Sequence, residues 1–560
     1  MSIRLAAAAA ALVLAACATA PEALHYPATR RVDQVDVYHG QPVADPYRWL
    51  EDDNAPETAA WVTAQNQVTD AYFARLPVLQ ALRQRLTALY DHPRDTVPER
   101  RGEWLYYRTN SGLQNQSVVV RQKGLDGAPE TVIDPNALSP DGTTRLLDFK
   151  VQPSGRYAAY ALSNAGSDWL EVRVLDLDQH RTLPERLQWV KVTELAWHGD
   201  GFFYSRYPAP PAGQALSSRN EDHQVYFHRL GTPQSEDTLA YRDAAHPQRF
   251  HQVQTSSDGR WAVLSISERG QGRQGNALFV RDLAGADPAF RPLVPEIGDA
   301  SFDFIDTADG RMLVKTDDAA PNGKVISIDP RAPARGNWRT VVPEQTSALQ
   351  GVTAAGGRLF VTRLVDVASQ VEVRALDGHV ERQLQLPSLG AVEGFEGRPD
   401  DAAVFYSFES FGVPPTIYRY DIASGRSSVF RAPVVPGYDP AAYETRQVFF
   451  TSKDGTRVPM FLVHRRGLVL DGRNPTLLVG YGGFNISYTP SFSALKLALL
   501  ERGFVYAVAN LRGGGEYGEA WHQAGTQLKK QNVFDDFIAA AEWLIAQRIT
   551  SPDQIGRAHV

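Results

Sequence analysis

The feature that most constrains the fold is a unit of strands and turns that recurs between residues 93 and 433. Each unit contains a small polar turn, an apolar strand, a loop and a second strand, and seven units can be counted. They begin near residues 102, 154, 200, 258, 309, 356 and 400, a spacing of about fifty residues that is typical of propeller blades. A β-sandwich is the alternative, but a closed ring leaves fewer strand edges exposed than two open sheets. The pattern therefore predicts a seven-bladed β-propeller.

Two glycine-rich segments near the end of the sequence each follow an apolar run. Residues 481–484 (Tyr-Gly-Gly-Phe) come after the run 476–480, and residues 512–518 (Arg-Gly-Gly-Gly-Glu-Tyr-Gly) come after the run 504–510. In an α/β hydrolase the reactive turns stand at the ends of core strands, so both runs are expected to be parallel core strands. The sequence predicts an incomplete α/β hydrolase with the propeller inserted into it, a multidomain chain with α+β and all-β parts.

Helical patterns are predicted on both sides of the repeats. Residues 56–89 are helical in pattern, and Pro93 ends that segment because proline cannot continue a helix. Residues 535–548 have apolar side chains at helical spacing, with Asp535 as the candidate cap. A β-hairpin is expected around residues 452–456. The predicted divisions are a signal and anchor region (1–20), a helical segment packing on the hydrolase part (21–92), the propeller (93–433), the truncated hydrolase part (434–554) and a tail (555–560).

The composition excludes two classes of function. A formal net charge of -7 over 560 residues, without a basic block, provides no electrostatic footprint for nucleic acid. The thirteen histidines include no His-Glu-x-x-His arrangement, and one cysteine cannot build a zinc cluster of thiolates, so no metal site is predicted. No cofactor is implied.

The only cysteine, Cys17, follows a positively charged start and an apolar run from Leu5 to Leu14. This run is too short to cross a bilayer core of about 30 Å, and the arrangement resembles a bacterial lipoprotein signal. It predicts export to the periplasm and a lipid anchor on Cys17, the only expected contact with a membrane. The alternative is a plain secretory signal cleaved near Ala20, which would discard Cys17.

The last six residues, 555–560, match one reading frame of a common sequencing-library adapter. They are therefore expected to be a non-native tail, and His559 is assigned no role. The alternative is a genuine terminus. On the first interpretation, the strand and turn that should carry a nucleophile are expected to be missing.

Several long segments resemble the prolyl oligopeptidase family over nearly everything after the signal. They are residues 38–40 and 45–51, 112–116, 166–169, 452–456, 481–485, 510–518 and 530–537. The resemblance implies a serine peptidase that cleaves short peptides after proline, with a seven-bladed propeller restricting access by size. Its expected partners are short proline-containing peptides, and a monomer is expected.

The resemblance implies roles for two residues of the first glycine segment. Tyr481 matches the tyrosine whose hydroxyl stabilises the oxyanion of acyl transfer, a large catalytic contribution. Phe484 matches the lining of the proline pocket. The alternatives are a buried tyrosine that caps a loop carbonyl and a phenylalanine of the core. The catalytic Ser, Asp and His are expected to be absent from these 560 residues, which predicts an inactive fragment.

The other polar residues near these segments are interpreted as structural. Residues 513–518 lack the lysine of a phosphate-binding loop and contain Glu516, which would repel phosphate. His522 is expected to be a structural histidine, and Asp535 and Asp536 are expected to cap a helix. Two functional alternatives stay open. One is an oligopeptidase B-like enzyme that cleaves after basic residues, and the other is a non-catalytic propeller that binds partners.

Overall fold

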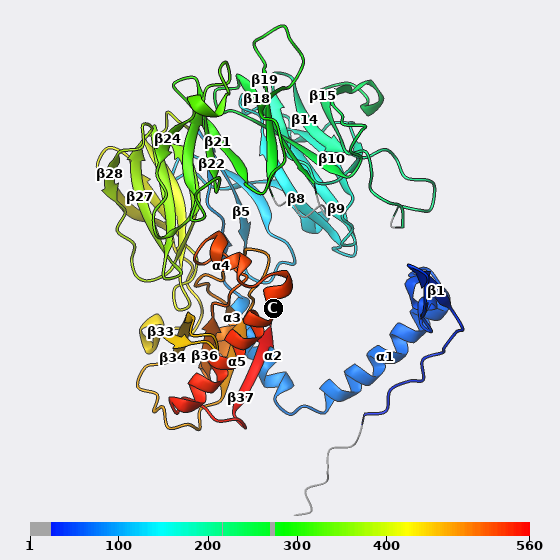
Figure 1. Ribbon diagram of the computed structural model, residues 1–560, viewed down its shortest axis with the longest axis vertical. Coiled ribbons are helices and arrows are strands. Elements are labelled where there is room, and N and C mark those ends of the chain that lie inside the picture. Colours follow the sequence, from blue (N-terminus) through cyan, green and yellow to red (C-terminus); the bar gives the residue numbers. More distant parts are fainter. Residues whose placement is uncertain (1–23, 216, 269–274, 560) are drawn as a thin grey trace, which may run out of the picture. The chain divides into compact units, whose positions relative to one another are not determined.

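The computed structural model describes residues 24–215, 217–268 and 275–559 (Figure 1). The predicted signal region 1–20 and its Cys17 lie outside the described residues. The chain divides into two units, residues 1–85 and residues 86–560, which are treated separately below.

The smaller unit combines a short hairpin with helix. Strand β1 (Val35–Tyr38) pairs antiparallel with β2 (Gln41–Ala44), and a 3-10 turn, η1 (Arg48–Glu51), precedes helix α1 (Pro56–Ala74). Helix α2 (Leu79–Tyr90) crosses the boundary between the units. The predicted helical character of residues 56–89 is therefore confirmed, with a break between the two helices. Arg30 holds the start of α1 through an ion pair with Glu57 at 2.6 Å.

The larger unit begins with the repeated strands, which form antiparallel sheets side by side in Figure 1. The first sheet has five strands: β3 (Arg94–Asp95), β4 (Glu99–Arg101), β5 (Trp104–Asn110), β6 (Val118–Lys123) and β7 (Glu130–Ile133). The second has nine strands: β8 (Thr144–Val151), β9 (Tyr157–Asn164), β10 (Leu170–Asp176), β11 (Arg181–Thr182), β12 (Leu187–Val190), β13 (Ala196–His198), β14 (Gly201–Arg206), β15 (Gln224–Arg229) and β16 (Thr238–Tyr241).

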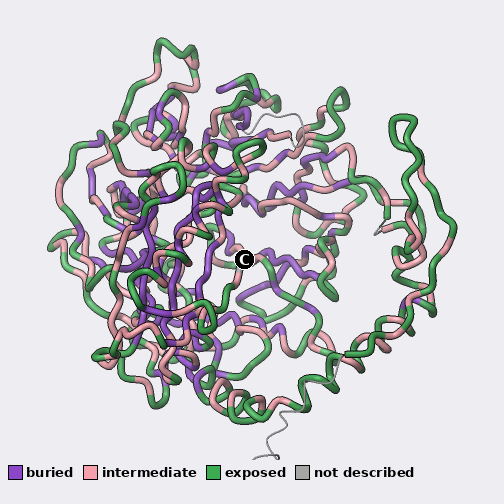
Figure 2. Tube along the Cα trace, turned by 60° about the horizontal axis from the view of Figure 1, so that its bottom comes forward, coloured by how far each residue is buried: buried purple, intermediate pink, exposed green. Residues whose placement is uncertain are grey.

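Four sheets of four strands follow in chain order. They are β17 (Arg249–Thr255), β18 (Trp261–Glu268), β19 (Asn276–Asp282) and β20 (Arg291–Val294); β21 (Phe302–Ala308), β22 (Arg311–Thr316), β23 (Lys324–Ile328) and β24 (Arg339–Val342); β25 (Ala348–Ala355), β26 (Arg358–Val365), β27 (Ala368–Ala375) and β28 (Val380–Gln383); and β29 (Ala391–Glu396), β30 (Ala403–Glu409), β31 (Thr416–Asp421) and β32 (Arg426–Arg431). Many residues of these strands are buried, and Figure 2 colours buried residues purple.

The repeated antiparallel sheets confirm the predicted β-propeller, but the prediction of seven separate blades is wrong. Among the described residues of the repeats, five sheets have four or five strands, and the second and third sequence repeats share the nine-stranded sheet. The reason is local, because β12 pairs on both of its sides. Val190 pairs with Leu170 of β10 and also with Arg206 of β14. A repeat spacing counts units of sequence and carries no information about such a bridging strand.

The remainder of the larger unit is a five-stranded sheet of the hydrolase type. Its order is β33 (Tyr443–Thr451), β34 (Arg457–Arg465), β36 (Val505–Ala509), β35 (Thr476–Gly480) and β37 (Ile555–His559). Strand β35 lies between β36 and β37 and is parallel to both. The predicted hairpin, β33 and β34, and the two predicted parallel strands are confirmed.

Helices cover this sheet. Helix α3 (Ala494–Leu500) contacts β34 and β36, while α5 (Gln531–Ala546) contributes Val533, Ala540 and Leu544 to the core beneath the sheet. A shorter helix, α4 (Glu519–Gln523), follows the second glycine segment. Helix α5 begins four residues before the predicted start, so Asp535 lies inside the helix and does not cap it.

The tail is part of the sheet. Residues 555–559, which belong to the predicted non-native tail, form β37 and pair with β35 from Thr476↔Ile555 to Gly480↔His559. A short segment with Ile555 at its start can pair with a buried strand whatever its origin, since backbone groups make the ladder. The predicted adapter origin of this tail is a statement about the gene and stays a prediction.

Candidate active site

The two glycine segments meet at one edge of the sheet. Strands β35 and β36 are parallel and in register, with Gly480 opposite Ala509, so the segments that follow them leave the sheet side by side. The carboxyl ends of parallel strands are where α/β folds build ligand sites. Two separate sequence motifs thus become one site.

Tyr481 is the first residue beyond β35. Its side chain is half-buried, and its ring centroid lies 6.5 Å from that of Phe484 with an interplanar angle of 35°. Within the described part of the chain its hydroxyl has no hydrogen-bond partner. The alternative of a tyrosine that caps a loop carbonyl is therefore not what the structure has. The hydroxyl is free to donate to a ligand.

Phe484 is not a core residue. Its side chain is 84% exposed, and it occupies the left-handed region with φ of 54°, followed by Asn485 with φ of 58°. Non-glycine residues seldom adopt this conformation, and when they do it is held by the surrounding structure. The sharp turn presents the phenylalanine ring outward beside Tyr481.

Gly482 is required by close packing. Its φ is 65°, and a Cβ added there would lie 2.6 Å from Cγ1 of Val533 and 2.8 Å from the carbonyl oxygen of Arg512. Lys530 fixes the same residue from the other side, donating from Nζ to the Gly482 carbonyl at 2.8 Å. The backbone after Tyr481 is thus held by α5 and by the second glycine segment.

The second glycine segment packs against the first. Asn485 donates its N–H to the carbonyl of Gly513 at 3.2 Å, and a Cβ on Gly515 would lie 2.5 Å from the carbonyl oxygen of Asn485. We call residues 513–518 the glycine loop and residues 481–488 the tyrosine loop. Because the two backbones touch, a displacement of the glycine loop must displace the tyrosine loop.

His522 is buried beneath this contact. Its Nδ1 lies 2.8 Å from the Gly513 carbonyl and 3.1 Å from the Asn485 nitrogen. With a proton on Nδ1 the ring donates to Gly513, and in the other tautomer it accepts from Asn485. In either tautomer His522 connects the two loops by a hydrogen bond, in keeping with the structural role predicted for it.

Arg512 is the main electrostatic element of the site. It is 4% exposed, and its guanidinium donates to the fully buried Asp536 at 2.6 Å and also contacts Asp454. Burial alone would lower the pKa of Arg512, but the hydrogen bonds to Asp536 and Asp454 raise it above its usual value. The same contact with Arg512 lowers the pKa of Asp454 to about 2. This arginine is ionised at any pH at which the protein folds.

The prediction that Asp536 caps a helix is wrong. Asp536 lies on the second turn of α5, and its side chain also accepts the main-chain N–H of Arg512 at 3.1 Å. Sequence reasoning missed this pair because the two residues are 24 positions apart. One signal was available in the sequence, because Asp536 lies on the apolar face of the predicted helix. Buried carboxylates are rarely unpaired, so an aspartate in that position indicates a buried partner.

Glu516 is the second buried acid. It is 2% exposed, accepts from the Tyr488 N–H at 3.0 Å, and has one carboxylate oxygen without a partner among the described residues. Burial raises its pKa above the usual value. Glu516 therefore joins the glycine loop to the end of the tyrosine loop.

Neither a metal site nor a membrane-spanning helix is found in the described ranges. No group of three or more His, Cys, Asp and Glu side chains there could hold a metal ion. No helix there combines the length and the apolar character needed to cross a bilayer.

A hydrolase-type sheet with a tyrosine and glycine loops at its carboxyl edge, preceded by a β-propeller, defines a class of propeller-bearing α/β hydrolases. Comparison with known proteins agrees. Residues 27–433 match the family model described as "Prolyl oligopeptidase, N-terminal beta-propeller domain", and residues 490–558 match that of the prolyl oligopeptidase family. The chain belongs to the prolyl oligopeptidase family, peptidase family S9.

Relatives cover nearly the whole chain. It is 39% identical over 531 residues to a prolyl endopeptidase of Elizabethkingia meningoseptica, covering 95% of this chain and 74% of that protein. It is 35% identical over 580 residues to prolyl oligopeptidase A of Galerina marginata, covering 95% and 77%. A solved structure from a study of two prolyl endopeptidases superposes with a TM-score of 0.88 at 38% identity, covering 95% of this chain and 78% of that one.

We predict that Asp536→Asn destabilises the protein strongly. Removing one partner of a buried ion pair leaves the other charge uncompensated, which typically costs about 3 to 5 kcal/mol in the free energy of unfolding. Denaturant unfolding followed by tryptophan fluorescence measures the loss. The neighbouring Asp535→Asn is the control, because Asp535 faces the 79%-exposed Lys453 at 4.0 Å, and such pairs contribute about 0 to 1 kcal/mol. Equal losses for both variants would contradict the assignment.

Proposed function

We propose that the protein is a serine endopeptidase that hydrolyses short peptides on the carboxyl side of proline, with the propeller restricting access by size. The observation that carries this proposal is the free hydroxyl of Tyr481, held at the carboxyl edge of the parallel sheet. The relatives named prolyl endopeptidase and prolyl oligopeptidase support the same reaction.

The chemistry follows from where charge develops. When a nucleophile attacks a peptide carbonyl, the oxygen becomes negative, and a donor aimed at it stabilises the transition state more than the ground state. Tyr481 supplies an O–H donor on a backbone that Gly482, Lys530 and Arg512 hold in place. A preorganised donor of this kind loses little energy to reorganisation during the reaction.

Phe484 supplies the apolar surface. Its exposed ring stands beside Tyr481, at a centroid distance of 6.5 Å. A proline side chain is a compact apolar ring with no hydrogen-bond donor, so it gains most from contact with a flat aromatic face. A substrate with proline before the scissile bond would place its ring on Phe484 and its carbonyl toward Tyr481.

In a longer product of the same reading frame that carries the nucleophile, we predict that Tyr481→Phe lowers kcat about 100- to 1,000-fold while KM changes little, because one oxyanion donor is lost and ground-state contacts remain. Peptide anilides that differ only in carrying proline or arginine before the leaving group measure both constants and the preference. The control is Tyr72→Phe on α1, a 46%-exposed position. A KM effect alone would contradict the assigned role, and faster cleavage after arginine would favour an oligopeptidase B-like specificity.

A fluorophosphonate probe, which reacts with catalytic serines, tests whether the nucleophile is present. In α/β hydrolases the nucleophilic serine stands on a Gly-x-Ser-x-Gly turn, and the 560 residues contain no such sequence. The 560-residue chain is therefore expected to remain unlabelled, while a longer product of the same reading frame that includes this turn is expected to be labelled. Labelling of the 560-residue chain, or a longer frame without the turn, would overturn the proposal.

We also propose export and a lipid anchor at Cys17. The support is the sequence alone: a short apolar run that places the only cysteine at the expected cleavage position. In a bacterium with two membranes, the wild-type protein is expected to incorporate labelled palmitate and to sediment with membranes, and Cys17→Ser is expected to do neither. A soluble, unlabelled wild-type protein starting after Ala20 would contradict this prediction.

A further inference from the structure

The glycine loop has a second neighbour in the propeller. A Cβ on Gly518 would lie 2.6 Å from the carbonyl oxygen of Pro321 and 2.5 Å from Oδ1 of Asn322, in the connection between β22 and β23. Glu519 donates its main-chain N–H to the same Pro321 carbonyl at 2.8 Å. The glycine loop therefore contacts both the propeller and the tyrosine loop.

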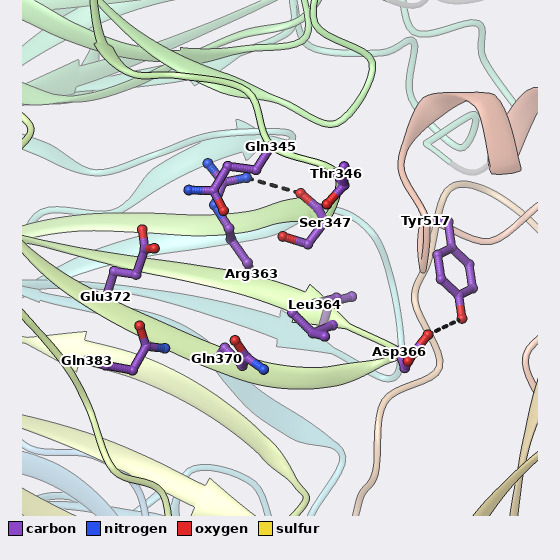
Figure 3. A pocket seen from close by; sticks show the side chains of 11 residues that line it. Gln345, Thr346, Ser347, Arg363, Leu364, Asp366, Gln370, Glu372, Gln383 and Tyr517 are labelled. Carbon is purple, nitrogen blue, oxygen red and sulfur yellow. Dashed lines mark hydrogen bonds between the residues drawn. The ribbon is translucent and has the colours of Figure 1, made fainter. Parts of the chain in front are cut away.

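A propeller hairpin makes the directed contact with the glycine loop. The two-residue turn between β26 and β27 consists of Asp366 and Val367, and Oδ1 of Asp366 accepts the hydroxyl of Tyr517 at 2.9 Å (Figure 3). The main-chain oxygen of Asp366 accepts from the side-chain amide of Gln447 on β33. The tip of one propeller hairpin thus binds the hydrolase sheet and the glycine loop together.

The turn itself is strained. Both of its residues have positive φ, 46° for Asp366 and 69° for Val367, as a tight two-residue hairpin requires. Aspartate tolerates this conformation, whereas a β-branched valine seldom adopts it and is strained there. Val367 is nonetheless fully buried. Strain at a buried tip indicates that the position of Asp366 is imposed by the packing around it.

The contact stands at the edge of a cavity. A pocket of about 350 Å³ is lined by Arg363, Gln370, Gln383 and other residues of the propeller together with Tyr517. Figure 3 shows the Tyr517 ring at the edge of this pocket with its hydroxyl directed at Asp366. Since part of the ring borders open space, its position depends on the hydroxyl contact and on Trp521, whose ring centroid lies 5.0 Å away.

We propose that Asp366 and Tyr517 are positioning residues through which the propeller sets the place of Tyr481. This inference rests on the proposed function for its catalytic consequence only. The path is continuous: Asp366 holds Tyr517, Tyr517 belongs to the glycine loop, and the Gly513 carbonyl of that loop accepts the Asn485 N–H of the tyrosine loop. Separation of the hairpin from the hydrolase sheet would remove one restraint on both loops. The propeller contact thus adds to the restraints from α5 and His522 that hold the oxyanion donor.

The test uses two substitutions that keep the local fold. Asp366→Gly retains the positive φ and removes the carboxylate, and Tyr517→Phe retains the ring and removes the donor. Both are expected to raise the hydrogen-exchange rate of the amides at residues 483–488 about tenfold in the 560-residue chain, the effect of losing one charge-assisted hydrogen bond. Asp366→Asn keeps an acceptor oxygen and is expected to restore the wild-type rate.

The control is Asp309→Gly. Asp309 occupies the same kind of turn, with φ of 50°, between β21 and β22. It is expected to leave exchange in the tyrosine loop unchanged. Unchanged exchange in Asp366→Gly and Tyr517→Phe, or an equal rise in Asp309→Gly, would overturn the inference.

A second measurement separates the inference from the proposed function. In a form of the protein with peptidase activity, Asp366→Gly and Tyr517→Phe are expected to lower kcat about tenfold at constant KM, in proportion to the exchange effect. If exchange responds but no form cleaves peptides, the proposed function fails and the positioning role stands. If kcat falls while exchange is unchanged, the positioning role fails.

Discussion

The buried ion pair of Arg512 with Asp536 is the interaction on which the site depends. Arg512 lies three residues after the end of β36, Asp536 belongs to α5, and the same guanidinium reaches Asp454 and Thr456 in the β33–β34 turn. One side chain therefore joins three elements that are distant in sequence. Two buried charges are costly to desolvate, so such a pair stabilises only when each charge is well matched. Here the guanidinium satisfies two carboxylates at the base of both loops.

The glycines of the two loops allow the backbones around this ion pair to pack closely. Gly482, Gly515 and Gly518 each stand where a Cβ would meet backbone or side-chain atoms at 2.6 Å or less. Three layers of chain, the tyrosine loop, the glycine loop and the propeller connection, can therefore approach more closely than side chains would allow. Close approach of backbones makes the position of one layer depend on the next, because packed interiors have little room to deform.

Much of this architecture could be predicted from the sequence. The parallel strands and the loops after them follow from local patterns of apolar residues and glycine. Long-range pairing could not be predicted in the same way. The role of Asp536 depends on an arginine on another element, and the merging of two repeats depends on the single pair between Val190 and Arg206. The start of α5 was placed too late because Gln531 to Phe534 carry no capping signal, and Lys530, the cap residue, makes no side-chain cap.

The propeller makes direct contacts with the elements that follow β36. A cover that only excluded large substrates would need shape and no specific contact with the hydrolase sheet. The observed contacts are directed: a strained turn presents Asp366 to Tyr517, and Pro321 accepts from Glu519. The first ends on the glycine loop, and the second ends on Glu519, the first residue of α4, directly after that loop. Because a misplacement of about 1 Å can cost two orders of magnitude in rate, a propeller hairpin that positions this loop would also affect the rate of the reaction.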